Sequence, residues 1–180
     1  MNIMTVILAS AISLCGSWQF RCTSPEGEWH QGTVPGCVHT DLLSGGMIQD
    51  PYYGDNEKRL QWIGEKDWEY ARTFNVSAAD LEQNHVELVF EGLDTYATVY
   101  VNDIEVIRAD NMFRTWKADV KDILIPGENR IAVRFESVFK ANIAKYLDAP
   151  FKLQAWPNND RADIWLSLYS RKAGYNYGWD

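Results

Sequence analysis

The chain has 180 residues, enough for one compact domain whose hydrophobic core needs no disulfide or metal. Hydrophobic residues make up 46% and charged residues 23%, which excludes a largely disordered chain. The net charge of −8 argues against a nucleic-acid partner, because phosphate binding needs a basic surface. Eight Trp, nine Tyr and seven Phe suit carbohydrate binding and a large β-core equally well.

The first residues are apolar, but the run is too short and too mixed to be a transmembrane helix. Residues 3–11 end in Ala9-Ser10-Ala11, a small-residue pattern typical of signal-peptide cleavage. No Lys or Arg precedes the run, so residues 1–11 are either a signal remnant or a first strand. We expect a periplasmic or secreted protein, with a cytoplasmic location left open. Residues 12–180 are expected to form a single domain, because no repeat or linker divides them.

The three cysteines, Cys15, Cys22 and Cys37, match no zinc-binding spacing. Their odd number prevents complete internal pairing. We favour free thiols, with one disulfide as the alternative in an oxidising compartment. No metal or other cofactor is predicted.

The first half of the domain is expected to contain one short helix and three strands. Residues 26–35 and 49–56 are predicted loops on either side of a helix at 40–43. From Trp68 onward, apolar and polar residues alternate with the period of two typical of half-buried strands. The strands predicted by this alternation span residues 68–76, 85–91 and 97–101.

Turn sequences organise the second half. Asn102-Asp103 indicates a hairpin that leads into a strand at 104–107. Pro126-Gly127-Glu128-Asn129 is a stronger signal, since Pro fixes φ and Gly permits positive φ, and a strand at 130–135 follows. Residues 138–147 have helical spacing, and 150–163 is a predicted loop. These elements predict an antiparallel β-sandwich with one or two short helices.

Motifs for a serine nucleophile, a zinc protease or a phosphate-binding loop are missing from the sequence. His85 lies on the polar face of a predicted strand, which favours a surface residue over a ligand. His39 is expected to have a structural role, either orienting Asp41 or capping a helix. A glycosidase needs two carboxylates at a defined separation, and twenty-five acidic residues give no basis for choosing a pair. The patterns alone leave an enzyme and a binding module equally open.

Three pairs of stretches carry a family resemblance. They are residues 16–20 with 34–43, residues 50–57 with 61–64 and 68–70, and residues 171–173 with 177–180. Val-Pro-Gly-Cys-Val-His-Thr-Asp-Leu and Asp-Pro-Tyr-Tyr-Gly-Asp-Asn-Glu are the specific pieces. Together with Ile-Pro-Gly-Glu-Asn, they resemble the N-terminal sugar-binding domain of family 2 glycoside hydrolases, most of all the β-mannosidase branch. The resemblance implies an all-β, jelly-roll β-sandwich that is galactose-binding-domain-like.

The same resemblance implies a retaining multidomain enzyme, in which a (β/α)8 barrel carries two catalytic glutamates. Nothing in this sequence corresponds to the barrel, so no catalytic residue is assigned and the chain alone is expected to be inactive. The implied partners are a carbohydrate substrate, either a β-mannoside or a related glycoside, and the remaining domains of the same polypeptide. A β-galactosidase or β-glucuronidase relative and a stand-alone carbohydrate-binding module are the alternatives.

Trp179 and Asp180 are the substrate-binding residues that the resemblance implies. In β-mannosidase relatives, the loop Gly-Trp-Asp-Trp-Gly-Pro reaches into the active site, and its first Trp and its Asp contact the sugar in the −1 subsite. The chemistry is suitable, because an indole covers an apolar sugar face and a carboxylate accepts hydrogen bonds from adjacent hydroxyls. Tyr52 and Tyr53, with their neighbours in residues 50–57, are expected to form a structural loop that packs against another domain.

Overall fold

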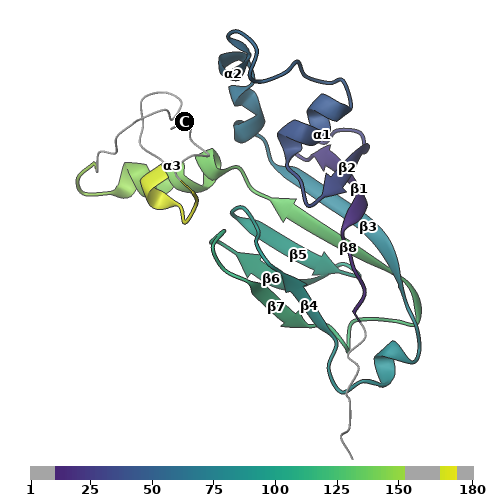
Figure 1. The fold of residues 1–180 in the computed structure, drawn as a ribbon. Coiled ribbons are helices and arrows are strands. Elements are labelled where there is room, and N and C mark those ends of the chain that lie inside the picture. Colours follow the sequence, from purple (N-terminus) through teal and green to yellow (C-terminus); the bar gives the residue numbers. More distant parts are fainter. Residues whose placement is uncertain (1–10, 153–166, 174–180) are drawn as a thin grey trace, which may run out of the picture.

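The structure is a computed structural model that describes residues 11–152 and 167–173 (Figure 1). Within these ranges, the strands form two antiparallel sheets, and the predicted β-sandwich is confirmed. The large sheet has the order β2-β1-β3-β8-β5-β6, and β4 pairs with β7 in a two-stranded sheet. The strands are β1 (Gly16–Cys22), β2 (His30–Val34), β3 (Trp68–Val76), β4 (Glu87–Phe90), β5 (Ala97–Val101), β6 (Ile104–Ala109), β7 (Trp116–Asp119) and β8 (Gly127–Phe135).

Alternating side chains give the large sheet one apolar face and one polar face. In β5, Ala97, Val99 and Val101 are buried, whereas Thr98 and Tyr100 remain partly exposed. The same alternation in neighbouring strands turns one set of side chains inward, because successive residues of a strand point to opposite faces. The largest apolar side chains that are almost completely buried are Phe20, Val99, Val101 and Ile131.

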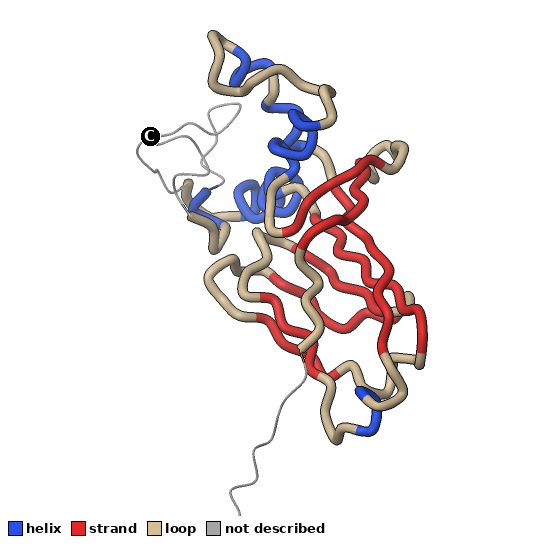
Figure 2. The backbone as a smooth tube through the Cα atoms, turned by 45° about the vertical axis from the view of Figure 1, so that its right-hand side comes forward, coloured by secondary structure: helices blue, strands red, loops and turns tan. Residues whose placement is uncertain are grey.

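Helical segments gather at one end of the sandwich, the upper end in Figure 1 and the end with most of the blue segments in Figure 2. Ser137 is the N-cap residue of helix α3, and its hydroxyl accepts a hydrogen bond from the Lys140 N–H and donates one of 2.6 Å to the carbonyl of Gly64. This second bond ties the helix to a short 3-10 segment. The elements at this end are α1 (Val38–Ser44), α2 (Asn56–Arg59), η1 (Gln61–Glu65), α3 (Val138–Asp148) and η4 (Ser167–Tyr169), while η2 (Asp80–Glu82) lies at the opposite end.

Four strands or α-helices differ from the sequence prediction, and the first of them, β1, was not predicted because only Trp18 and Phe20 alternate as buried residues in its short span. Strand β2 lies within residues 26–35, a predicted loop, because an edge strand pairs on one side only and its sequence shows no apolar alternation. Strand β7 and helix α2 were not predicted, since four residues are too few for a period to appear. The described residues therefore contain three α-helices instead of one or two.

Both predicted turns are confirmed. Asn102 and Asp103 have φ angles of 48° and 65°, the left-handed pair that a tight hairpin needs. Gly127 has a φ of 97°, and β8 begins there, three residues before the prediction. The buried side chain of Asn129 joins the two turns, because its Oδ1 accepts hydrogen bonds from Asn102 Nδ2 at 2.8 Å and from the Ile125 N–H at 2.9 Å.

Candidate functional site

A buried carboxylate fixes helix α1 to the large sheet. Asp41 accepts a hydrogen bond of 2.6 Å from the Tyr70 hydroxyl and one of 3.1 Å from the Thr33 N–H. Burial raises the pKa of Tyr70 and the Asp41 carboxylate raises it further, so the hydroxyl keeps its proton and remains the donor. Tyr70 and Thr33, and not His39, therefore orient Asp41. Cys37 is the N-cap residue of α1.

His39 lies on the first turn of α1, close enough to Lys172 of the C-terminal segment for an electrostatic interaction. Surrounding protein atoms lower the pKa of His39 by desolvation, although part of its surface is open to solvent, and the Lys172 ammonium lowers it further. The lowered pKa favours the neutral imidazole, which has one ring nitrogen to donate and one to accept a hydrogen bond. Two of the stretches that carry the family resemblance, residues 34–43 and 171–173, are thus near enough for an electrostatic interaction between His39 and Lys172.

A hydrogen-bonded hub around the Tyr96 hydroxyl holds the C-terminal segment against the sandwich. The hydroxyl lies 2.8 Å from Oδ1 of Asn142 on α3 and 3.0 Å from the carbonyl oxygen of Tyr169, and it accepts a hydrogen bond from Lys145 Nζ at 2.9 Å. Asn142 has no exposed surface, and its amide group also donates to the Ser170 hydroxyl. The residue that precedes β5, helix α3 and the C-terminal segment are therefore joined through one cluster around the buried Asn142.

The residues after this hub are bonded to the β6–β7 loop and to Asp94. The Arg171 carbonyl accepts a hydrogen bond of 3.0 Å from the Met112 N–H, and the Ala173 N–H lies 2.9 Å from the Met112 sulfur. Between them, Lys172 forms an ion pair with Asp94, with only 14% of the lysine side chain exposed. The chain is therefore held in place up to Ala173.

Trp179 and Asp180, the predicted sugar contacts, lie outside the described residues. The hub that precedes them could not be predicted from the sequence, because a tyrosine ahead of a strand has no distinguishing pattern. One weak signal was available: Asn142 is a polar residue beside Phe139 and Ile143, on the apolar side of the predicted helix.

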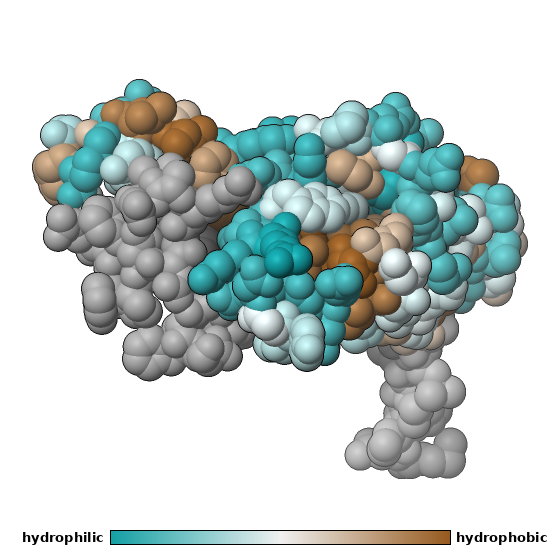
Figure 3. All heavy atoms as spheres, turned by 90° about the horizontal axis from the view of Figure 1, so that it is seen from above, coloured by the Kyte–Doolittle hydropathy of each residue, from teal (hydrophilic) through white to brown (hydrophobic). Residues whose placement is uncertain are grey.

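The loop at residues 50–57 is closed from within and presents aromatic side chains to solvent. Asn56 is buried, and its Nδ2 donates a hydrogen bond of 2.8 Å to the Asp50 carbonyl. Tyr52 and Tyr53 are 98% and 78% exposed. Figure 3 looks onto this end of the molecule and shows apolar groups, in brown, at its surface. The other large apolar side chains exposed on or beside the helical elements are Leu43, Met47, Trp62, Leu147, Phe151 and Leu168.

His85, predicted to be a surface residue, is exposed on the polar side of the two-stranded sheet and bonds to Asp119 at 2.6 Å. The His85 hydrogen bond lowers the pKa of Asp119. In the described part of the chain, no three His, Cys, Asp or Glu side chains are grouped as metal ligands would be. No helix of residues 11–152 or 167–173 is long and apolar enough to cross a membrane.

Residues 18–180 match the family described as glycosyl hydrolase 2 galactose-binding domain-like. The chain belongs to this family. The crystal structure of β-D-mannosidase from Dictyoglomus thermophilum aligns with this glycosyl hydrolase 2 domain at a TM-score of 0.86 and 37% identity, over 94% of this chain and 20% of that one. A probable β-mannosidase of Caenorhabditis elegans is 35% identical over 94% of this chain and 19% of its own length.

The glycosyl hydrolase 2 domain thus spans about a fifth of the length of the curated relatives it matches. A more distant structure, the exo-chitosanase CsxA of Amycolatopsis orientalis, aligns at a TM-score of 0.60 and 20% identity over 67% of this chain and 16% of that one. At that identity the likeness concerns the fold alone.

Proposed function

We propose that this domain is part of a retaining glycoside hydrolase of the β-mannosidase type, which hydrolyses terminal β-linked sugars with catalytic carboxylates carried by another domain. The observation that carries the proposal is the likeness to the Dictyoglomus thermophilum β-D-mannosidase, at 37% identity and a TM-score of 0.86 over 94% of this chain. Structures of β-glucuronidases align at only 20–22% identity and support no choice of sugar. A β-mannoside is therefore the favoured substrate.

Within this enzyme, the domain supports the catalytic barrel and supplies Trp179 and Asp180 as contacts to the sugar in the −1 subsite. Two features support this role. The Tyr96 hub and the Asp94–Lys172 ion pair hold the chain just ahead of these residues, and preorganisation of this kind is what a sugar contact needs. An indole and a carboxylate are also suited to the apolar face and the hydroxyls of a pyranose.

The test is an Asp180→Asn substitution in the full-length enzyme, assayed with p-nitrophenyl β-mannoside. We expect kcat/KM to fall by about 100-fold, because two charge-assisted hydrogen bonds to the sugar are weakened. Asp103→Asn is the matched control, since its side chain is 88% exposed in a turn of the β-sandwich, and we expect it to leave kcat/KM unchanged. Unchanged activity of Asp180→Asn would remove the sugar-contact role. Faster hydrolysis of the matching glucuronide or galactoside would reject the β-mannosidase type.

The remaining domains of the polypeptide are the second partner, and they dock on the helical end. Tyr52 and Tyr53 project there among other exposed apolar side chains, and a surface of this kind is typical of a contact region.

Export to the periplasm or secretion is the proposed location, supported by the apolar residues 3–11 and the Ala9-Ser10-Ala11 pattern. Cell fractionation with an antibody against the domain tests this location, and a cytoplasmic majority would contradict it.

A further inference from the structure

A row of polar side chains crosses the face of the large sheet opposite the core. Strand pairing places Arg108 of β6 beside Thr98 of β5, and Thr98 beside Arg134 of β8. The row continues through Glu69 of β3 to Arg21 of β1. Directly paired residues share one face of a sheet, so all five side chains lie on the same side.

In one half of this row, the charged side chains form ion pairs with one another. Glu69 is 1% exposed and accepts hydrogen bonds from Arg21 at 2.8 and 3.0 Å and from Arg134 at 3.4 Å. The Arg134 guanidinium also lies over the Tyr100 ring, 5.1 Å from its centre. The charges on the β1 and β3 side are therefore already paired.

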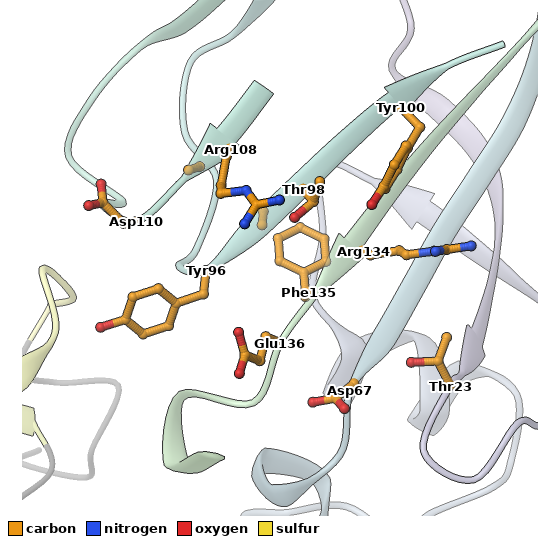
Figure 4. Close-up of a pocket in the computed structure, with 12 residues that line it drawn as sticks. Thr23, Asp67, Tyr96, Thr98, Tyr100, Arg108, Asp110, Arg134, Phe135 and Glu136 are labelled. Carbon is orange, nitrogen blue, oxygen red and sulfur yellow. The ribbon is translucent and has the colours of Figure 1, made fainter. Parts of the chain in front are cut away.

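The other half opens into a groove over β5, β6 and the end of β8 (Figure 4). Its volume is about 430 Å³, within the range of roughly 300–1,000 Å³ found for small-molecule sites. In Figure 4 the Arg108 guanidinium extends over Thr98, and the Glu136 carboxylate lies between Tyr96 and Asp67. Half-buried aromatic rings, guanidinium groups and carboxylates thus line one cavity.

Several of these polar groups are unused by the rest of the described chain. The carboxylates of Asp110 and Glu136 and the hydroxyls of Thr98 and Tyr100 form no hydrogen bond or ion pair with described residues. Arg108 uses Nε and Nη2 to bond Glu105 and keeps Nη1 for another acceptor. The groove therefore offers acceptors, hydroxyls and a spare cationic donor within a short distance of one another.

We infer that this groove binds a short neutral oligosaccharide. The hydroxyls of a hexose donate to Glu136 and Asp110 and accept from Arg108, while the rings of Tyr96 and Tyr100 supply surface for its apolar C–H groups. The inference goes beyond the proposed function and does not depend on it, since it stands on the side chains of the groove.

Charge decides which class of sugar fits. The carboxylates of Asp110 and Glu136, which have no ionic partner among the described residues, repel a uronate, whereas the guanidinium groups of Arg108 and Arg134 are paired with Glu105 and Glu69. A neutral hexose chain does not meet this repulsion, so neutral probes are expected to bind more tightly than a uronate.

Calorimetric titration of the 180-residue chain with β-1,4-mannotetraose and with cellotetraose tests the groove. We expect at least one of them to bind with a Kd below ~1 mM, and Glu136→Gln and Arg108→Gln each to weaken that binding about tenfold. Glu128→Gln is the matched control, because Glu128 is an exposed glutamate at the opposite end of β8. This variant is expected to bind the oligosaccharide with the same affinity as the unchanged chain. Circular dichroism melts of every variant check that the fold is kept.

An Asp180→Asn variant separates this site from the proposed function. Unchanged affinity in that variant supports the groove, whereas loss of binding assigns the sugar to the C-terminal residues and overturns the inference. The inference is also overturned by the absence of binding to both neutral probes. Wild-type affinity in both groove variants, or tighter binding of trigalacturonate or chitosan tetramer, overturns it as well.

Discussion

Glu69 is a buried carboxylate on the polar face of the large sheet, where arginines from two strands surround it. Burial alone would raise the pKa of Glu69, but the Arg21 hydrogen bond and the charges of Arg134 and Arg130 outweigh burial and lower it. Its pKa in the folded chain therefore lies below the unfolded value of 4.5. A lowered pKa means that ionised Glu69 stabilises the fold at pH values above 4.5, and that this stability is lost as the pH falls toward the folded-state pKa.

Replacing Glu69 by Gln is expected to reduce the free energy of unfolding at pH 7 by about 2 kcal/mol, because the buried side chain loses its charge-assisted hydrogen bonds with Arg21 and Arg134. The loss should shrink as the pH is lowered below 4.5, where the unchanged chain loses the same interaction. Urea unfolding at neutral and acidic pH measures both effects, with Glu128→Gln as the exposed control. An equal loss at all pH values would show that the charge of Glu69 is not responsible.

At the scale of the element, strand β2 depends on a close approach that only glycine permits. Gly32 lies where a Cβ atom would come within 3.1 Å of Asp41 Oδ2 and of a Phe20 ring carbon, and within 3.2 Å of a Tyr70 ring carbon. These neighbours belong to the contact that attaches α1 to the sheet, so crowding here acts on the strand and the helix together.

Gly32→Ala is expected to lower the free energy of unfolding by about 1–3 kcal/mol through overpacking. Gly64→Ala provides the matched control, since a Cβ atom there meets nothing within 4 Å and the backbone φ is not positive. The difference in melting temperature between the two variants measures the effect. Equal melting temperatures would mean that the sheet relaxes around the extra methyl group.

The C-terminal segment is the second element that depends on distant contacts, and Tyr96→Phe tests this dependence. Removing the hydroxyl deletes the atom that Asn142, Tyr169 and Lys145 share. We expect the amide hydrogen of Met112, which is bonded to the Arg171 carbonyl, to exchange about tenfold faster while the global melting temperature changes little. Exchange at the Val120 N–H, bonded to the Val86 carbonyl in another part of the chain, serves as the internal reference.

At the scale of the whole molecule, the helical end combines a closed loop with exposed aromatic side chains. A loop that Asn56 closes presents the side chains of Tyr52 and Tyr53 to solvent. The two rings are therefore not part of the hydrophobic core of this domain. An exposed aromatic pair on an ordered loop is typical of a surface that another domain covers.

A double change of Tyr52 and Tyr53 to Ser is expected to leave the melting temperature of the 180-residue chain unchanged. In the full-length protein it should lower the melting temperature by several degrees, because apolar contact area between domains is lost. The measurement is thermal unfolding of the 180-residue chain and of the full-length protein, each with and without the double change. A similar decrease in both would place the two rings in the fold of this domain and not in an interface.

Much of the sandwich followed from the sequence, because the period of two and the turn residues are local properties. The strands β3, β5, β6 and β8 were predicted within a few residues, and the turns at Asn102-Asp103 and Gly127 were predicted with their conformation. Strand β1, edge strand β2 and the four-residue elements β7 and α2 were not, since short or unalternating segments carry too little periodic signal.

The fold class, the two main turns and the family can be predicted from the sequence alone, since alternation, turn chemistry and family motifs are properties of neighbouring residues. Contacts between distant residues depend on the packing of the folded chain. Tyr96 and Tyr169 are 73 positions apart, and Arg21 and Glu69 are 48 apart. Strand order and the packing of α3 bring each pair together, and neither is encoded in a local pattern. The hub ahead of the C-terminal residues and the groove across β5, β6 and β8 are therefore products of the packed molecule.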